Sequence, residues 1–275
     1  MSTLVKSLGI LAVAGTSAAS AALSANNLLA FYDYNGNASD RSGNAPDATL
    51  QSGAVISADG LGYSGNAGDS ALDVTAASAH ALTTGLDLSS AISGNAMAVS
   101  FWQFNIGNGA GARSQSTAFG ILGTGLEARG FGAHTTWADG NIYFDHSGCC
   151  NQPAQRLIAP GLGDTLVDGW HHIVLQVDNG AAQIWVDGSL LSEHPSGAAG
   201  IASSLTGEVR VGQQYDGTVD FDGRLDEFAV WNTSLEPSEI QALANGASTL
   251  SLIPEPSSGL LLLLGGGLLF GRRRR

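Results

Sequence analysis

Residues that could recognise a small polar ligand are concentrated between positions 134 and 156 of this sequence. Aromatic rings can stack on a sugar ring, while carboxylate and guanidinium groups can hydrogen-bond to its hydroxyls. We expect a ligand site formed by His134, Trp137, Asp139, Tyr143, Asp145 and Arg156, with His146 close by. The alternative is that Trp137 and Tyr143 fill the protein interior, as aromatic residues of strands usually do.

The only two cysteines, Cys149 and Cys150, are adjacent within the same stretch. Neighbouring Cα atoms lie about 3.8 Å apart, which is less than the roughly 4.4–6.8 Å usual for a disulfide. A bond between them would therefore close a strained ring that stiffens the tip of a turn. We predict this vicinal disulfide, because exported proteins are oxidised. A bridge between two copies of the protein and a pair of free thiols are the alternatives.

Catalytic patterns are weak in this sequence. Glycoside hydrolysis needs two carboxylates about 5–10 Å apart, and the nearest candidates are Asp220, Asp222, Asp226 and Glu227. No Gly-x-Ser-x-Gly motif of a serine hydrolase occurs. The adjacent His171 and His172 would point to opposite faces of a strand, so we expect one to be packed inside and the other to be solvated. We predict no catalytic residue.

The loop around Asp40 is rich in Asn, Ser and Gly. Side-chain and backbone oxygens could converge there, as a hard cation with six to eight oxygen ligands requires. The loop is therefore a candidate calcium site, although Asp40 could equally stabilise a turn through its side chain.

These residues must be positioned by strands, because short β-forming runs recur between turn signals along the chain. The runs are Leu28–Tyr34, Ala71–Thr75, Met97–Ile106, Ala118–Gly123, Asn141–His146, His171–Asp178, Ala182–Gly188, Glu208–Gly212 and Asp222–Asn232. Such spacing predicts an all-β sandwich. Asn179-Gly180 predicts a tight hairpin, and Pro237 begins one short helix that ends at Gly246.

The composition indicates an acidic body. Residues 26–250 contain six arginines and no lysine against more than twenty carboxylates, so this part is more acidic than the net charge of −13 for the whole chain suggests. Nucleic acid and anionic lipid both require a positive protein surface, and we exclude them as partners of the body. An acidic surface favours solubility and cation binding.

Both ends of the chain are typical of export rather than of a fold. Lys6 precedes a run of small and apolar residues, which predicts a signal peptide over residues 1–25. Residues 251–275 contain Pro254, Glu255 and Pro256, an apolar run over 260–270, and Arg272, Arg273, Arg274 and Arg275. The apolar run is slightly short for a bilayer span, and the arginines would remain on the cytoplasmic side. We expect a transmembrane-type helix in the inner membrane.

This tail resembles the PEP-CTERM sorting signal of Gram-negative bacteria that make exopolysaccharide. The resemblance implies processing by an exosortase-type membrane enzyme. It also implies an inner-membrane intermediate, followed by delivery to the cell surface or the extracellular matrix. A permanent tail anchor is the alternative. The body, residues 26–250, has an ordinary length for a single all-β sandwich.

Three blocks of the body resemble LamG-like domains. They are the hairpin WHHIVLQVDNGAAQIWVDG at 170–188, the segment FDGRLDEFAVWNTSLEPSEIQAL at 221–243 and the opening FYDYNGNASDRSGNAPDATL at 31–50. The resemblance implies a concanavalin A-like jelly roll, an all-β sandwich of two antiparallel sheets with one short C-terminal helix. This fold hosts lectins, adhesion modules and glycosidases, so it does not fix the function.

LamG-like domains commonly hold one structural calcium ion between the early loop and the last strand. Carried over to this chain, the resemblance implies ligands from Asp40, the carbonyl of Gly43, Asn44 and Glu227. The Glu-x-Asp-x-x-Glu pattern of related retaining glucanases is absent. We predict an exported, non-enzymatic module that binds polysaccharide or another matrix component. A secreted glycosidase or lyase, and a matrix protein without a discrete ligand, are the alternatives.

Overall fold

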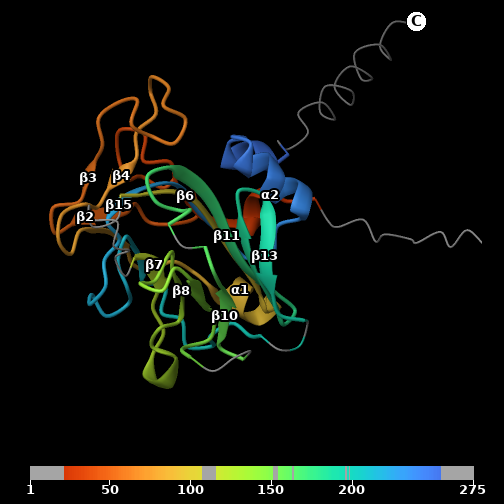
Figure 1. Ribbon diagram of the computed structural model, residues 1–275. Helices are drawn as coiled ribbons and strands as arrows, with labels where there is room; N and C mark the ends of the chain where they lie inside the picture. The colour runs from red at the N-terminus through yellow and green to blue at the C-terminus, as the bar shows by residue number, and fades with distance from the viewer. Residues whose placement is uncertain are drawn as a thin grey trace, which may run out of the picture.

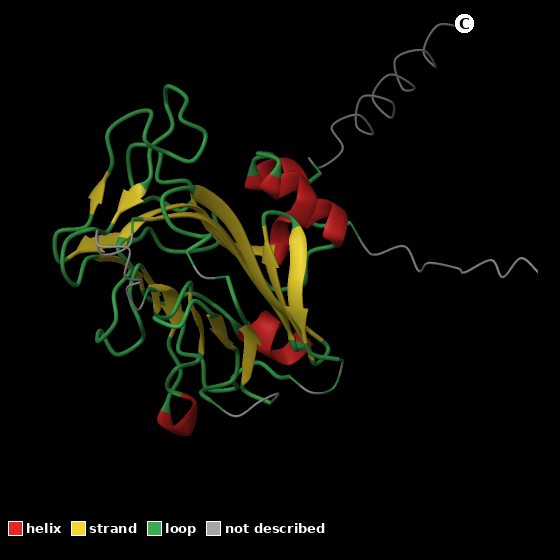
Figure 2. Cartoon of the chain, viewed as in Figure 1, coloured by secondary structure: helices red, strands yellow, loops and turns green. Residues whose placement is uncertain are grey.

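Two antiparallel sheets stack face to face in the computed structural model of the protein (Figures 1 and 2). The structure describes residues 22–106, 116–150, 154–162, 164–195, 197 and 199–254. The arrangement confirms the predicted two-sheet jelly-roll sandwich.

The first sheet has eight strands. Its order is β13-β12-β11-β6-β15-β4-β3, and β1 pairs with the same edge of β15 as β4, nearer the end of β15. The strands are β1 (Leu28–Tyr32), β3 (Val55–Ile56), β4 (Leu72–Asp73), β6 (Ala96–Asn105), β11 (Trp170–Asp178), β12 (Ala181–Val186), β13 (Ser189–Glu193) and β15 (Gly223–Trp231). The long strands β6, β11 and β15 form its centre, and Asn179 and Gly180 adopt the positive φ angles of the predicted hairpin turn.

The second sheet has seven strands in the order β10-β9-β8-β7-β14-β5-β2. The strands are β2 (Thr49–Gln51), β5 (His80–Thr83), β7 (Thr117–Ile121), β8 (Phe131–His134), β9 (Ile142–Asp145), β10 (Arg156–Ala159) and β14 (Val209–Val211). All pairings along this path are antiparallel.

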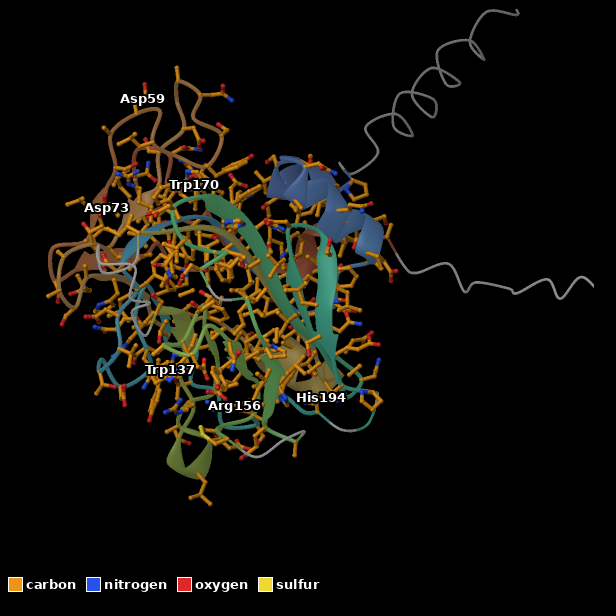
Figure 3. The ribbon with its side chains drawn as sticks, viewed as in Figure 1. Asp59, Asp73, Trp137, Arg156, Trp170 and His194 are labelled. Atoms are coloured by element: carbon orange, nitrogen blue, oxygen red, sulfur yellow. A yellow bond between two sulfur atoms is a disulfide. The ribbon has the colours of Figure 1, made fainter. Side chains whose placement is uncertain are left out.

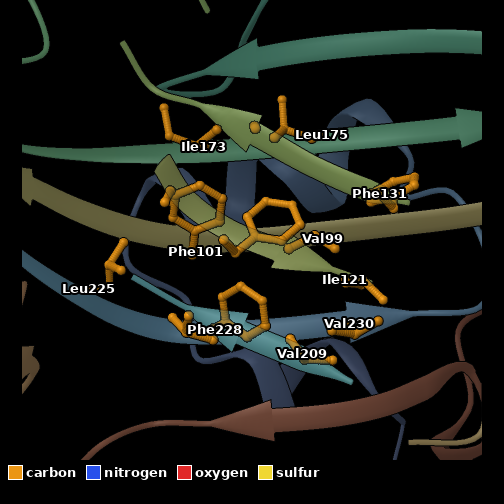
Figure 4. Packing of buried hydrophobic residues seen from close by; sticks show 14 of the residues in the cluster. Val99, Phe101, Ile121, Phe131, Ile173, Leu175, Val209, Leu225, Phe228 and Val230 are labelled. Atoms are coloured by element: carbon orange, nitrogen blue, oxygen red, sulfur yellow. The ribbon is translucent and has the colours of Figure 1, made fainter. Parts of the chain in front are cut away.

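The main hydrophobic core lies between the two sheets (Figure 4). Phe101 on β6 and Phe228 on β15 meet Phe119 on β7, with ring centroids 5.6 and 5.5 Å from that of Phe119. Along each strand alternate residues point inward, and these inward residues are almost all apolar. The core therefore does not depend on the outward residues of each sheet, which can form surface sites or contact other elements.

Helix α2 (Pro237–Ala244) covers the outer face of the eight-stranded sheet (Figure 1). Its buried Ile240 and Leu243 belong to a second apolar cluster with Trp185 and Trp231. This is the predicted C-terminal helix. The structure adds a second short helix, α1 (Ser89–Gly94), and three 3-10 turns, η1 (Ala25–Asn27), η2 (Gly125–Glu127) and η3 (Thr249–Leu252).

The adjacent histidines follow the expectation only in part, because the buried one, His172, lies on the outer face of the sheet beside Trp102, and the other, His171, is half-buried. His172 is buried, while His171 bonds through Nδ1 to the carboxylate of Asp187, 2.8 Å away. Of the four tryptophans outside the predicted ligand site, Trp185 and Trp231 are buried, whereas Trp102 and Trp170 are half-buried on the outer face of the eight-stranded sheet.

The predicted sorting segment falls almost wholly outside the described residues, which end at Pro254. Glu255, Pro256 and the four terminal arginines lie beyond that point. Among the residues that are described, none of the helices has the length and apolar character needed to cross a membrane.

Candidate functional site

The predicted ligand residues gather on the outer face of the seven-stranded sheet. On β8, β9 and β10 the residues Phe131, Ala133, Ile142, Phe144, Leu157 and Ala159 point into the core. Because side chains alternate along a strand, His134, Tyr143, Asp145 and Arg156 project from the opposite face. The register places Arg156 beside Asp145, and Tyr143 beside His134, on neighbouring strands.

Two glycines leave the floor of this face bare. Gly120 on β7 and Gly132 on β8 are cross-strand partners, and Gly132 is in turn the partner of Asp145. A Cβ atom on Gly132 would lie 2.7 Å from the carbonyl oxygen of Phe119, and one on Gly120 would lie 3.0 Å from the amide nitrogen of Tyr215. Gly120 therefore lets the loop that carries Tyr215 lie close over the sheet, while Gly132 lets β8 approach the backbone of β7 closely.

A buried ion-pair network occupies one end of the floor. Arg156 binds both carboxylate oxygens of Asp145, with Nη2 2.8 Å from Oδ2. Arg129 reaches the same carboxylate, with Nη1 3.4 Å from Oδ2. The side chain of Asp145 is 5% exposed, compared with 14% for Arg156 and 29% for Arg129. Two guanidinium groups thus share one carboxylate.

His134 is a neutral member of the same site. Burial and the two neighbouring arginines lower the pKa of its imidazole to about 3. Its Nδ1 lies 2.8 Å from Oγ1 of Thr117, and Nη1 of Arg129 lies 3.4 Å from its Nε2. Since Arg129 can only donate, His134 accepts at Nε2 and donates from Nδ1 to Thr117.

Aromatic side chains form the walls of a cleft of about 200 Å³ over this network. It is lined by Arg129, His134, Trp137, Tyr143, Cys150 and Arg156. Trp137 and Arg156 lie on the side of the molecule away from α2 (Figure 3). Trp137 and Tyr143 are half-buried and face this cleft, so the alternative that they fill the sandwich core is wrong.

The remaining predicted residues lie around the cleft rather than in it. Asp139 is exposed at the rim, where it accepts hydrogen bonds from Asn141 and from the Tyr143 hydroxyl, 2.6 Å away. Burial alone would raise its pKa, but the hydrogen bonds from Tyr143 and Asn141 together outweigh that effect and lower it. His146 is buried and bonds to the carbonyl oxygen of Gly200, away from the ligand-facing groups.

The two cysteines lie at the edge of the cleft. Cys149 and Cys150 pair with each other in the structure, and Nη2 of Arg156 lies 3.3 Å from Sγ of Cys149. The turn tip is thereby held next to the ion-pair network, and Cys150 contributes to the cleft wall.

The predicted calcium ligands do not fit a cation site in this structure. The carboxylate of Asp40 accepts hydrogen bonds from five backbone N–H groups, those of Phe31, Ser42, Gly43, Asn44 and Ala45. The amide nitrogen of Asn44 donates to two backbone carbonyls. Glu227 instead bonds to Thr249. Across the described part of the chain, no three His, Cys, Asp or Glu side chains converge to hold a metal ion.

Asp40 therefore acts as the acceptor that shapes the loop after β1. We expect Asp40→Ala to lower the free energy of unfolding by about 2 kcal/mol, because several backbone donors lose their charged acceptor. The loss of unfolding free energy should be the same in the presence of a chelator and of excess calcium, as measured by urea denaturation.

Calcium binding by this loop stays a prediction. A calorimetric calcium titration that gives heat with the parent chain and none with Asp40→Ala would restore Asp40 as a ligand.

The fold and the site can be compared with known proteins. The family model of the concanavalin A-like lectin/glucanases superfamily matches residues 69–241, more than half of the chain. The chain belongs to this superfamily. The LamG-like resemblance of the sequence is thereby confirmed.

Individual relatives of the superfamily are distant. Mouse usherin is 30% identical over an aligned stretch of 101 positions, a match that covers 34% of this chain and 2% of usherin. Domain 4 of AbnA, a GH43 extracellular arabinanase from Geobacillus stearothermophilus solved with arabinotriose, matches with a TM-score of 0.58 and 20% identity over 79% of this chain and 98% of that domain. The binding domain of botulinum neurotoxin DC, solved with SialylT, matches with a TM-score of 0.57 and 12% identity over 82% of this chain and 52% of that chain.

Two parts of the site escaped sequence reasoning. Arg129 precedes the predicted stretch of residues 134–156, and Tyr215 follows that stretch by some sixty residues. The two nevertheless meet in the structure, where the guanidinium carbon of Arg129 lies 5.7 Å from the centroid of the Tyr215 ring. Membership of the superfamily alone does not point to either residue. The scarcity of arginine in the body was the available signal, because each of the six arginines in so acidic a chain calls for an explanation.

Proposed function

We propose that this protein is an exported, non-enzymatic module that binds carbohydrate or another matrix component at the cell surface. The observation that carries the proposal is the cleft on the outer face of the seven-stranded sheet. It combines two half-buried aromatic rings, Trp137 and Tyr143, with the donors of Arg129 and Arg156. Sugar sites use this combination, because the ring faces of sugars are apolar while their rims are polar.

Two of the similar structures support the choice of ligand class. The arabinanase domain was solved in complex with arabinotriose, and the neurotoxin binding domain in complex with SialylT. Both are distant in sequence, so the proposal rests on the cleft of this chain and takes from them only the ligand class.

The carboxylates of the cleft favour binding over hydrolysis. A glycosidase needs one carboxyl that stays protonated and a second that acts as base or nucleophile. Here Asp145 is held by two guanidinium groups, and Asp139 has a lowered pKa in an exposed position. Asp139 is therefore poorly suited to donate a proton, and Asp145 has both oxygens engaged by Arg156, so the two do not form an acid and nucleophile pair. Assays of reducing-sugar release from glycans that bind would detect any hydrolysis.

We also propose the export route indicated by the two ends of the chain. The basic and apolar start over residues 1–25 and the order of Pro-Glu-Pro, apolar run and arginines over 251–275 support it. In this proposal an exosortase-type enzyme processes the tail at the inner membrane of a Gram-negative bacterium. The module is then delivered to the cell surface or to the extracellular matrix.

Trp137 provides the test of the binding function. We expect the full-length chain, purified in mild detergent, to bind a subset of a glycan array. Trp137→Ala should weaken that binding at least about 10-fold, because a buried aromatic contact at the centre of a site commonly contributes 2 kcal/mol or more. Trp170→Ala is the matched control, since Trp170 is also half-buried but lies on β11 of the other sheet (Figure 3). An array with no bound glycan, or equal loss in both variants, contradicts the proposal.

A further inference from the structure

The cleft is a positively charged spot on an acidic protein. The described part of the chain contains no lysine. Its arginines are Arg41, Arg129, Arg156, Arg210 and Arg224. Arg41, Arg210 and Arg224 each pair with a carboxylate of their own. Within the described part of the chain, only Arg129 and Arg156 share a single carboxylate, that of Asp145. The neutral His134 adds no charge. The buried cluster therefore carries one unneutralised positive charge.

Arg129 is the member of the pair that can bind a ligand. Both oxygens of Asp145 are already engaged by Arg156, which is the more buried arginine. Among the described residues, the hydrogen bonds of Arg129 are long and come from Nη1 alone, at 3.4 Å to Asp145 and 3.4 Å to His134. Within the described structure its Nε and Nη2 have no hydrogen-bond acceptor. These donors can hold a planar carboxylate in the bidentate geometry that guanidinium groups prefer.

Nearby acids do not cancel this charge. Asp216 and Asp139 lie at the rim, are exposed, and accept hydrogen bonds within their own loops. Solvent screens exposed charges far more than buried ones. Arg129 lines both this cleft and the narrow pocket over Gly120 and Gly132, so its guanidinium group stands between the aromatic walls and the bare floor.

The size of the cleft limits what can accompany the carboxylate. About 200 Å³ is below the roughly 300–1,000 Å³ of pockets for drug-sized ligands, which suits one sugar residue. Trp137 lies with its ring 4.4 Å from that of His134, and Tyr143 lies 4.9 Å from the guanidinium carbon of Arg156. An indole face for stacking thus lies in the same cleft as a cationic donor.

We propose that the cleft selects a carboxylate-bearing sugar residue, with the carboxylate on Arg129 and the sugar ring against Trp137. This inference rests on the proposed carbohydrate-binding function and narrows its ligand to acidic glycans. Uronic acids and sialic acids both carry the required group. An acidic protein would repel such glycans elsewhere on its surface, which makes binding specific to this one cleft.

The test uses matched sugars that differ in the carboxylate. Trigalacturonate is compared with its methyl ester, and sialyllactose with lactose, by titration of the full-length chain at low and high salt. We expect the acidic member of at least one pair to bind 10-fold or more tightly, with the preference reduced by salt. Arg129→Gln should abolish the preference, Arg129→Lys should keep only part of it because lysine retains the charge but not the bidentate geometry, and Arg210→Gln, on the same sheet face, should leave it unchanged.

The outcomes separate this inference from the function on which it rests. The pair that shows the preference identifies the source of the carboxylate. The acidic ligand is ruled out if neither pair shows a preference for the acidic sugar. It is also ruled out if the Arg129→Gln variant keeps that preference while its thermal midpoint is unchanged. Neutral glycans that bind the array in a Trp137-dependent manner would then leave the carbohydrate-binding function standing, whereas an array without binding would remove both.

Discussion

Replacing Asp145 with asparagine is expected to lower the free energy of unfolding by about 3–5 kcal/mol. The substitution keeps the size of the side chain, so it creates no cavity. It removes the only carboxylate that Arg129 and Arg156 contact in the described structure, and it leaves two guanidinium groups at a site that is 5% exposed at its centre. Urea denaturation at pH 7, followed by tryptophan fluorescence, measures the loss.

Two further variants distinguish the cost of leaving buried charges unpaired from the cost of breaking an ion pair as such. Asp73→Asn breaks the pair of Asp73 with Arg224, whose side chains are 19% and 29% exposed, and it should cost less than about 1 kcal/mol. Combining Asp145→Asn with Arg156→Met should recover a large part of the loss, because the more buried of the two stranded charges is then gone. A loss below about 1 kcal/mol in Asp145→Asn itself would show that the network is solvated and would weaken the argument for a charged cleft.

The long strands were predictable from sequence because their apolar residues continue over many positions. Each of the nine predicted runs contains a strand, and β6, β11 and β15 follow their runs closely. The missed strands are short or polar. β8, Phe131–His134, contains Gly132, and β10 starts with Arg156, so neither shows the apolar alternation from which strands are read. Sheet neighbours on both sides, not local preference, make these segments extended.

The candidate site was predictable only where its residues lie close in the chain. His134, Tyr143, Asp145 and Arg156 come from three consecutive strands, so a cluster in sequence became a cluster in space. Arg129 and Tyr215 join them through pairing between β7, β8 and β14, which no local pattern reveals. The residues predicted to bind calcium illustrate a related limit of local patterns: a loop rich in polar residues can supply N–H donors to a carboxylate, as it does to Asp40, as readily as oxygens to a cation.

A second group of carboxylates lies far from the cleft, on β15. Asp226 is fully buried, and its oxygens accept hydrogen bonds from the backbone N–H groups of Tyr63 and Glu227. Burial raises the pKa of Asp226 from 3.8 to about 8, with Asp69 and Glu227 adding to the effect. Burial likewise raises the pKa of Glu227 from 4.5 to about 7. Among the described residues no arginine contacts either carboxylate, so both are held largely protonated below pH 7.

These shifts predict that stability falls as the pH rises from about 6.5 to 8. In this range the folded state holds protons on Asp226 and Glu227 that the unfolded chain has already released, so the unfolded state binds fewer protons and stability falls. Below about pH 6.5 the buried His134 and His172, whose pKa values are lowered to about 3 and about 4, act in the opposite sense and flatten the curve. Each group contributes up to about 1.4 kcal/mol per pH unit, and we expect a net loss on the order of 2 kcal/mol between pH 6.5 and pH 8. Urea denaturation in the presence of a chelator, at half-unit steps of pH, measures it.

Glu227→Gln should flatten this dependence and stabilise the protein at pH 8. The amide cannot ionise, yet its oxygen can still accept the hydrogen bond from Thr249. Removing the charge of Glu227 also eases the ionisation of Asp226, because the two carboxylates repel each other. The slope of the free energy of unfolding against pH should therefore fall by more than the contribution of Glu227 alone. Glu193→Gln, on the exposed edge strand β13, should leave it unchanged. Stability that rises from pH 6.5 to pH 8 would mean that cations or solvent neutralise this pair, and that burial does not control its protonation.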